Sequence, residues 1–493
     1  METIKEGIDL MDLPRSFQDV VTVSRSLGLH YLWIDSLCII QDDINDWHRE
    51  SIKMRVVYSN ATVVIAASRA TSDEAGFLQA RLLGATIAIS CDGIHPWFYL
   101  QQVQQTYDRD EDPLRWEPLS CRAWAIQERY LSSRYLAFAT HEVFWECKTA
   151  RLAEDGRSTQ KRKQHCIEQL IPRLIADKAP SAFKVSREEV SCHFGWLSMV
   201  TEYMSCQITF PSDRLPAISG LADRLWRETQ DVYLEGIWRR SLIPGLLWHN
   251  RNINTALRRP ETSRVPSWSW ASIEGGIFFS LCDEIYAYPG GLEYFAVLRE
   301  HDHEMRNSMF ATGNGQRLVL YVPVLPISGW SGPFDFRDFP ESLFGGPEHQ
   351  KRILAIHISY FPSERLITVE LPEATLYIVG SLDLPSTDVD FLDMFVVFLA
   401  GSCPPPPEMA QRKSLWGLIV KRNDDKTTYS RVGMVKGHFM VANKTLKAQD
   451  LLSMYASLSL ESILLVWAPD KMDRHPWQET PFDERDKRVL TLI

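Results

Sequence analysis

Apolar side chains in the first 60 residues recur with a helical period. Residues 13–27 place Phe17, Val20 and Val21 on one face. Residues 43–58 repeat this pattern behind a pair of aspartates, a residue type that helix N-termini favour. We therefore predict a helix in each of these two segments.

Each of these helical patterns is followed by a continuous apolar run that is typical of a buried strand. Residues 31–34 stop abruptly at Asp35 and Ser36, as a buried strand does at the functional edge of a parallel sheet. Residues 62–67 form the second run. Helix, strand, helix and strand in succession predict an α/β domain with a mostly parallel sheet.

A third helix and two more strands are predicted before the pattern changes. The helix begins at Ser120 and continues to Tyr130, and apolar runs follow at residues 135–139 and 143–147. These elements extend the α/β domain to about residue 152.

The remainder of the chain divides into two parts with different patterns of apolar and polar residues. The first has helical periodicity, and the second consists of short alternating runs bounded by turn residues. Residues 415–420 and 429–435 flank Asn423 as the strands of a hairpin would. We predict an α/β domain at residues 1–152, a mainly helical region at 165–260 and a β-rich region at 261–493.

Composition and charge narrow the classes of function. Lys and Arg total 53 against 63 Asp and Glu, and the net charge of −10 disfavours binding of nucleic acid or anionic membranes over the whole surface. No apolar stretch approaches the ~20 residues of a membrane span, and we find no secretory signal. The nine cysteines suit reduced thiols and offer no zinc site; Cys38 and Cys121 lack a nearby His and are weak candidates for nucleophiles. We expect a folded, cytoplasmic protein without a metal.

Polar side chains at the end of the first apolar run are the first candidates for chemistry. The sequence signatures of the commonest hydrolases, NTPases, dehydrogenases and zinc proteases are missing. Asp35 and Ser36 would stand at the carboxyl end of a strand, where open α/β sheets bind ligands. A bond to a loop is an equally open interpretation of Asp35. For Asp46 and Glu50, which share a face of the next helix, we favour capping and solvation of that helix.

The second group of candidates lies at the start of the third predicted helix. Arg122, Trp124, Gln127 and Glu128 fall within two helical turns. A carboxylate beside an indole can have its pKa raised, and it can bind sugar hydroxyls or stabilise an oxocarbenium ion. The alternative is that Glu128 pairs with a neighbouring arginine and that Trp124 belongs to the core.

Long motifs make the N-terminal segment similar to a known family. They read YLWIDSLCIIQDDINDW at residues 31–47, RAWAIQERYLSSRYLAF at 122–138 and VFWEC at 143–147. Together they closely resemble the fungal heterokaryon-incompatibility (HET) domain over roughly residues 10–150. Later segments resemble those of full-length HET-domain proteins, among them PSWSWAS at 266–272.

The resemblance implies non-self recognition and programmed cell death when genetically different hyphae fuse. HET domains are thought to be remote relatives of TIR domains, several of which cleave NAD with one essential Glu in the pattern W-C-x-x-E. Trp124 and Glu128 have the same spacing, with Ala125 in place of the Cys. The resemblance therefore implies that Glu128 is the essential carboxylate.

The predicted site unites both groups of candidates, with Glu128 as the catalytic residue. NAD is the candidate substrate, and we expect no cofactor and no metal. The predicted substrate-binding residues are Asp35, Ser36, Arg122, Trp124 and Gln127.

One departure from the family concerns the start of the domain. HET domains normally begin with a strand reading approximately Y-x-x-L-S-Y-x-W-G, and this chain starts after it, so we expect a TIR-like sheet without its first strand. The alternative function is a non-catalytic scaffold that self-associates as TIR domains do. The expected partners are other copies of the domain and an unknown allorecognition partner, without nucleic acid or a membrane span.

Overall fold

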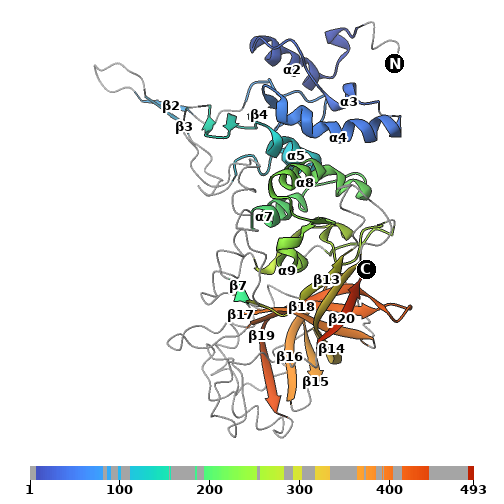
Figure 1. Cartoon of the computed structure of the whole chain (residues 1–493). Helices are drawn as coiled ribbons and strands as arrows, with labels where there is room; N and C mark the ends of the chain where they lie inside the picture. The colour runs from blue at the N-terminus through green and yellow to red at the C-terminus, as the bar shows by residue number, and fades with distance from the viewer. Residues whose placement is uncertain are drawn as a thin grey trace. The chain divides into compact units, whose positions relative to one another are not determined.

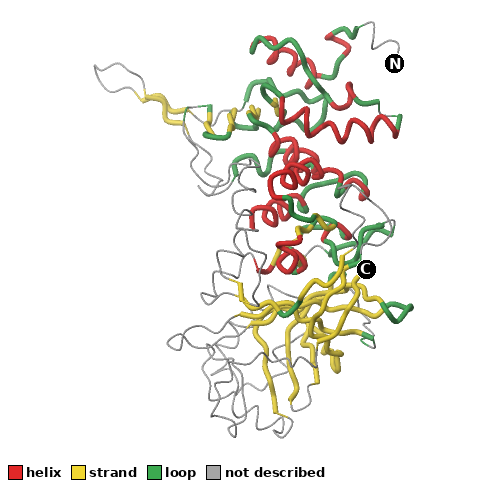
Figure 2. Tube along the Cα trace, viewed as in Figure 1, coloured by secondary structure: helices red, strands yellow, loops and turns green. Residues whose placement is uncertain are grey.

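The chain folds into two compact units in a computed structural model (Figures 1 and 2). Unit 1 comprises Met1–Pro172 and Cys206–Glu228, and unit 2 comprises Arg173–Ser205 and Thr229–Ile493. The structure describes residues 7–40, 42–81, 86–89, 98–101, 112–154, 156, 184–185, 194–251, 256–261, 263–281, 292–301, 317–333, 364–370, 374–384, 391, 393–402, 414–443 and 487–493.

Helices make up one part of unit 1 and include the three that the sequence predicts. Pro14 precedes the first of them and Gly28 follows it with φ +71°, so the predicted helix end is confirmed. Asp43 caps the second by accepting the backbone N–H groups of Asn45 and Asp46. The helices are η1 (Leu10–Asp12), α2 (Arg15–Ser26), α3 (Asp35–Cys38), α4 (Ile44–Asn60), η2 (Pro118–Cys121), α5 (Ala123–Leu131), η4 (Pro211–Asp213) and α8 (Pro216–Thr229).

The strands of unit 1 form a four-stranded mixed sheet. Its strands are β1 (Val64–Ala66), β4 (Arg134–Phe138), β5 (Val143–Cys147) and β6 (Arg151–Ala153), in the order β1-β4-β5-β6. A separate antiparallel pair is formed by β2 (Thr86–Ile89) and β3 (Phe98–Gln101). Tyr58 at the end of α4 packs against the sheet core, which includes Val64, Tyr135 and Phe144.

The prediction of a mostly parallel sheet in this unit was wrong. In the described four-stranded sheet, β1 and β4 pair in parallel, whereas β5 pairs antiparallel with both β4 and β6. Residues 139–142 are the whole connection between β4 and β5, and a parallel pair needs a crossover of a dozen or more residues. A hairpin is therefore the arrangement that this spacing permits.

The prediction of a central strand at residues 31–34 was also wrong. Ile34 has extended backbone angles, φ −129° and ψ 125°, but among the described residues this segment pairs with no strand. Tyr31 is 97% exposed. An apolar run favours extended backbone, yet it becomes a strand only where a neighbouring strand satisfies its hydrogen bonds.

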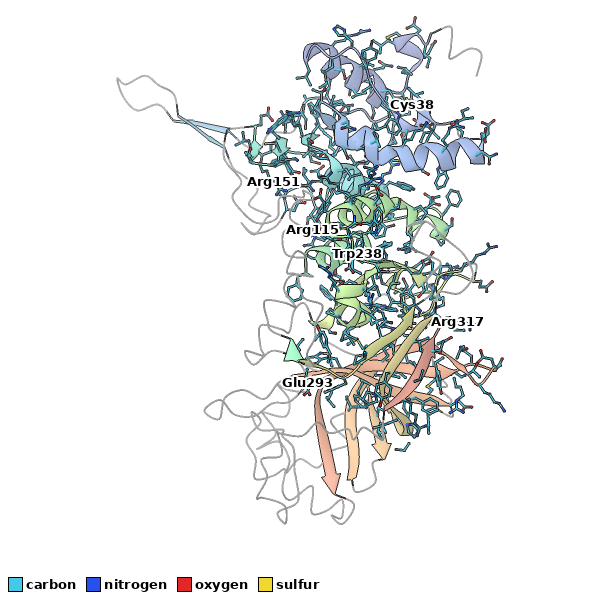
Figure 3. All side chains as sticks on the ribbon, in the orientation of Figure 1. Cys38, Arg115, Arg151, Trp238, Glu293 and Arg317 are labelled. Carbon is cyan, nitrogen blue, oxygen red and sulfur yellow. The ribbon has the colours of Figure 1, made fainter. Side chains whose placement is uncertain are left out.

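Unit 2 begins with helices and short hairpins around a core of buried tryptophans. The described part of the region predicted to be mainly helical contains helices, and it also contains short strands that the sequence did not predict. The backbone carbonyl of Gly236 accepts the indole N–H of both Trp196 (2.9 Å) and Trp270 (3.0 Å). Trp238, labelled in Figure 3, is 1% exposed. The elements are α7 (Phe194–Tyr203), β8 (Tyr233–Leu234), β9 (Ile237–Trp238), η5 (Arg239–Ser241), α9 (Leu242–Leu246), β10 (Trp248–Asn250), η6 (Trp270–Ser272) and β11 (Ile277–Phe279).

The rest of unit 2 confirms the β-rich C-terminal region. Nine strands of a ten-stranded sheet follow the order β13-β14-β15-β16-β19-β18-β17-β12-β7. The tenth strand, β20, pairs with both β14 and β19. An additional pairing between β14 and β17 closes six of the strands into a ring. The predicted hairpin is β18 and β19, with Arg422 opposite Tyr429. The strands are β7 (Lys184–Val185), β12 (Leu292–Tyr294), β13 (Val297–His301), β14 (Leu318–Pro333), β15 (Glu364–Glu370), β16 (Ala374–Leu382), β17 (Met394–Ser402), β18 (Ser414–Arg422), β19 (Thr428–Asn443) and β20 (Lys487–Leu492).

A fully buried arginine ties the sheet of unit 2 to the tryptophan core. Arg431 of β19 is 0% exposed and pairs with Asp383 at 2.9 Å. Its guanidinium also donates to the carbonyls of Leu246 and Trp248 and stacks on the Trp248 ring. The charge is compensated and its N–H groups have partners, which makes this cluster a structural one.

Candidate functional site

Asp35 and Ser36 lie at the start of α3, immediately after the extended segment at residues 31–34. Both are exposed. Asp35 is the first residue of this single helical turn, and its carboxylate accepts the backbone N–H of Ser36 at 2.8 Å. Cys38, labelled in Figure 3, is the last residue of α3.

The second group of candidates lies on α5, whose N-terminus is fixed by a neighbouring segment of unit 1. Arg122 stands at the N-cap position and is exposed. Gln207 accepts the backbone N–H of Ala123 at 2.9 Å and donates its own to the carbonyl of Cys121 at 2.6 Å. In Figure 1, α5 lies between α4 and α8, so the helix is held on two sides within unit 1.

Glu128 faces the Asp35 region from α5. The residue is partly buried, and the loss of hydration raises the pKa of its carboxyl to about 7. The negative charge of Asp35 raises this pKa further, while the positive charge of Arg122 and a hydrogen bond from Tyr58 lower it. Asp35 and Glu128, which are 93 positions apart in the chain, therefore share one electrostatic site.

Tyr58 is a site residue that the sequence interpretation missed. Burial raises the pKa of its hydroxyl well above 10, and the charges of Glu128 and Asp35 add to this shift. The Trp33 ring packs on Tyr58 edge to face, with the ring centroids 5.7 Å apart. Tyr58 is the last residue of the helix predicted over residues 43–58, and apolar spacing carries no sign that its hydroxyl meets a carboxylate.

Trp124 shares a face of α5 with Glu128 because the two residues are four positions apart. It is partly buried and packs edge to face against Trp47 of α4, with the ring centroids 6.3 Å apart. Each of the two candidate segments therefore carries a tryptophan close in sequence to its acid, Trp33 before Asp35 and Trp124 before Glu128.

Gln127 points away from this group. Its side-chain oxygen accepts the backbone N–H of Gly220 in α8 at 2.7 Å, and the residue is 1% exposed. The structure thus brings together Asp35, Arg122 and Glu128, with Ser36 and Trp124 beside them in sequence and on the helix face. It gives Gln127 a contact with α8 instead.

The two acids of α4 have different contacts: Asp46 is buried and bonds the segment before the helix, whereas Glu50 pairs within the helix. Asp46 accepts the backbone N–H of Ile40 at 2.9 Å and pairs with Arg49. Glu50 pairs with Lys53 at 2.7 Å, which lowers the pKa of Glu50. In the part of the chain that the structure describes, no group of three His, Cys, Asp or Glu side chains could hold a metal ion.

Comparison with known families gives one result. A family model described as Heterokaryon incompatibility protein (HET) matches residues 1–128. The N-terminal segment of the chain is a HET domain. The matched segment includes every predicted site residue, from Asp35 to Glu128. No curated protein and no solved structure matches the chain.

The HET-domain protein has no helix, within its described ranges, of the length and apolar character that a bilayer crossing requires.

Proposed function

We propose that this HET-domain protein is a cell-death effector of fungal heterokaryon incompatibility, and that its HET domain hydrolyses NAD with Glu128 as the catalytic carboxylate. The family match supports the first part of this proposal. The second part rests on the site around Glu128.

The observation that carries the proposal is the electrostatic state of Glu128. Within the described residues it forms no ion pair, and its hydrogen bond comes from the neutral hydroxyl of Tyr58. A carboxyl with a pKa of about 7 beside a second acid destabilises the folded chain when it ionises, so it gives no structural benefit at neutral pH. Groups with such shifted pKa values concentrate at functional sites.

This state suits cleavage of the bond between nicotinamide and ribose. The C1′–N bond breaks, its electron pair leaves with nicotinamide as a neutral molecule, and an oxocarbenium-like ribosyl group remains. A carboxylate beside the ribose stabilises that positive charge. Water then attacks C1′ and gives up a proton, which a base with a pKa near 7 accepts efficiently at neutral pH.

The neighbours of Glu128 match the remaining parts of the substrate. The exposed guanidinium of Arg122 can bind the pyrophosphate, as arginine does through paired hydrogen bonds. The ring of Trp124 offers a face for a base, and the negative charge of Asp35 favours the cationic nicotinamide ring.

The test measures release of nicotinamide from NAD by the purified full chain and by its Glu128→Gln variant. Gln keeps the shape and hydrogen-bonding capacity but has no charge, so we expect a loss of about 10²–10³-fold in rate. Glu74→Gln is the matched control, because Glu74 is an exposed acid of the same unit, and it should keep the full rate.

The same three proteins, expressed in fungal cells, separate this function from the scaffold alternative. We expect wild type and Glu74→Gln to deplete NAD and kill, and Glu128→Gln to do neither. Killing by Glu128→Gln with cellular NAD unchanged in all three strains would contradict the catalytic proposal and favour assembly as the signal.

A further inference from the structure

Three consecutive side chains of α5 contact three different parts of unit 1. Gln127 bonds α8, Glu128 faces Asp35 and Tyr58, and Arg129 reaches the sheet. Successive residues of an α-helix point about 100° apart, so Gln127 and Arg129 project on either side of Glu128.

The contact of Gln127 with α8 is buried and tightly fitted. Its side-chain oxygen satisfies the backbone N–H of Gly220, and a Cβ added at Gly220 would stand 2.7 Å from that oxygen. It would also stand 3.0 Å from Cβ of Arg55. Glycine at this position lets α8 approach α5 closely enough for the bond.

The contact of Arg129 with the sheet is a buried ionic cluster. Its guanidinium donates to both oxygens of Asp112, at 2.7 and 3.0 Å, and to both oxygens of Glu146 of β5, at 2.8 and 2.5 Å. Arg151 of β6, labelled in Figure 3, pairs with the same two acids. Arg129 is 6% exposed, so water does not compete freely for these bonds.

Together the two contacts determine which way α5 faces. A rotation of the helix about its axis in either direction would break the bond of Gln127 to α8 or the paired bonds of Arg129 to the sheet. Both sets of bonds are buried, and a buried group that loses its partner is costly.

We propose that Gln127 and Arg129 are positioning residues that lock the rotation of α5 and so hold the Glu128 carboxyl against Asp35 and Tyr58. The inference rests on the proposed function in taking Glu128 as the reacting group. It replaces substrate binding as the role of Gln127.

The test uses two variants that disturb the α8 contact from opposite sides. Gln127→Leu removes the acceptor, and Gly220→Ala places a methyl group against it; neither changes a charged residue. The readout is the pKa of Glu128, from ¹³C NMR of protein labelled at the glutamate carboxyl carbon, with its signal assigned by its absence in Glu128→Gln. We expect both variants to lower this pKa from about 7 towards 4.5, because the carboxyl moves away from Asp35 and into water.

Phe77→Leu is the control for a general loss of stability. Phe77 is a buried core residue of unit 1 that packs on Phe138, and this variant should leave the pKa of Glu128 unchanged. If Gln127→Leu and Gly220→Ala lower the thermal stability as Phe77→Leu does while Glu128 titrates as in wild type, the positioning role is wrong. Arg129→Lys keeps the positive charge but cannot form the paired hydrogen bonds to Asp112 and Glu146. The pKa of Glu128 in this variant tests the contact of α5 with the sheet in the same way.

The titration does not depend on catalysis, so it separates this inference from the proposed function. If wild type cleaves no NAD, the pKa values still decide whether the contacts of Gln127 and Arg129 position Glu128. If wild type does cleave NAD, Gln127→Leu should lower kcat by about 10²-fold with little change in KM, as misplacement of a reacting group does.

Discussion

Two glutamates of unit 1, Glu128 on α5 and Glu146 on β5, show how the same side chain serves two purposes. Glu146 is 9% exposed and accepts hydrogen bonds from Arg129, and it pairs with Arg151 as well. Glu128 is also partly buried, but its contacts are the hydroxyl of Tyr58 and the charge of Arg122, and a second acid lies nearby.

The difference lies in how each negative charge is compensated. Around Glu146 two arginines face two acids, so the buried charges balance and the cluster holds α5, β5 and β6 in place. Around Glu128 the balance is incomplete, and burial therefore raises its pKa. A compensated glutamate stabilises the fold, whereas an uncompensated one is ready to exchange a proton.

The largest expected effect comes from breaking the compensated cluster. Glu146→Gln removes one acid and leaves two buried arginines with Asp112 alone, so unit 1 should lose about 3–5 kcal/mol of unfolding free energy. Chemical denaturation at neutral pH measures this loss. Glu74→Gln is again the control and should change stability little. A loss below 1 kcal/mol for Glu146→Gln would mean that the cluster does not anchor α5.

A smaller effect of opposite sign is expected at Glu128. Folding raises the pKa of Glu128 from 4.5 to about 7, so its contribution to stability is fully present below pH 4.5 and is lost as the pH rises through 7. Gln cannot ionise and avoids this loss. Relative to wild type, Glu128→Gln should gain on the order of 1–3 kcal/mol between pH 4.5 and pH 8. Denaturation of both proteins across this range checks the prediction, and a constant difference would contradict it.

The helices of the N-terminal unit could be predicted because their signals are local. The apolar face of α4, the cap at Asp43 and the left-handed Gly28 all lie within or next to the helices that they define. Strand pairing is not local in this way. Residues 31–34 have the composition of a strand and an extended backbone at Ile34, but composition does not reveal whether a neighbouring strand is present.

The candidate site residues could be recognised only within their own segments. Asp35 and Glu128 each stand out there, but Asp35 begins the short helix α3 and does not follow a strand as predicted. The partners that orient Glu128 could not be predicted, because the bond of Gln127 to Gly220 and that of Tyr58 to Glu128 join positions far apart in the chain. Gln127 was predicted to bind a ligand because it precedes Glu128 in the sequence, but its side chain bonds Gly220 of α8 instead.

The most direct test of the account is the titration of Glu128 itself. We expect the carboxyl of Glu128 to titrate with a pKa of about 7 in the wild-type chain, and with a lower pKa in Asp35→Asn, because the charge of Asp35 raises it. ¹³C NMR of the labelled side chain measures both values. A wild-type pKa near 4.5 that does not change in Asp35→Asn would contradict the claim that Glu128 and Asp35 form one uncompensated acidic site.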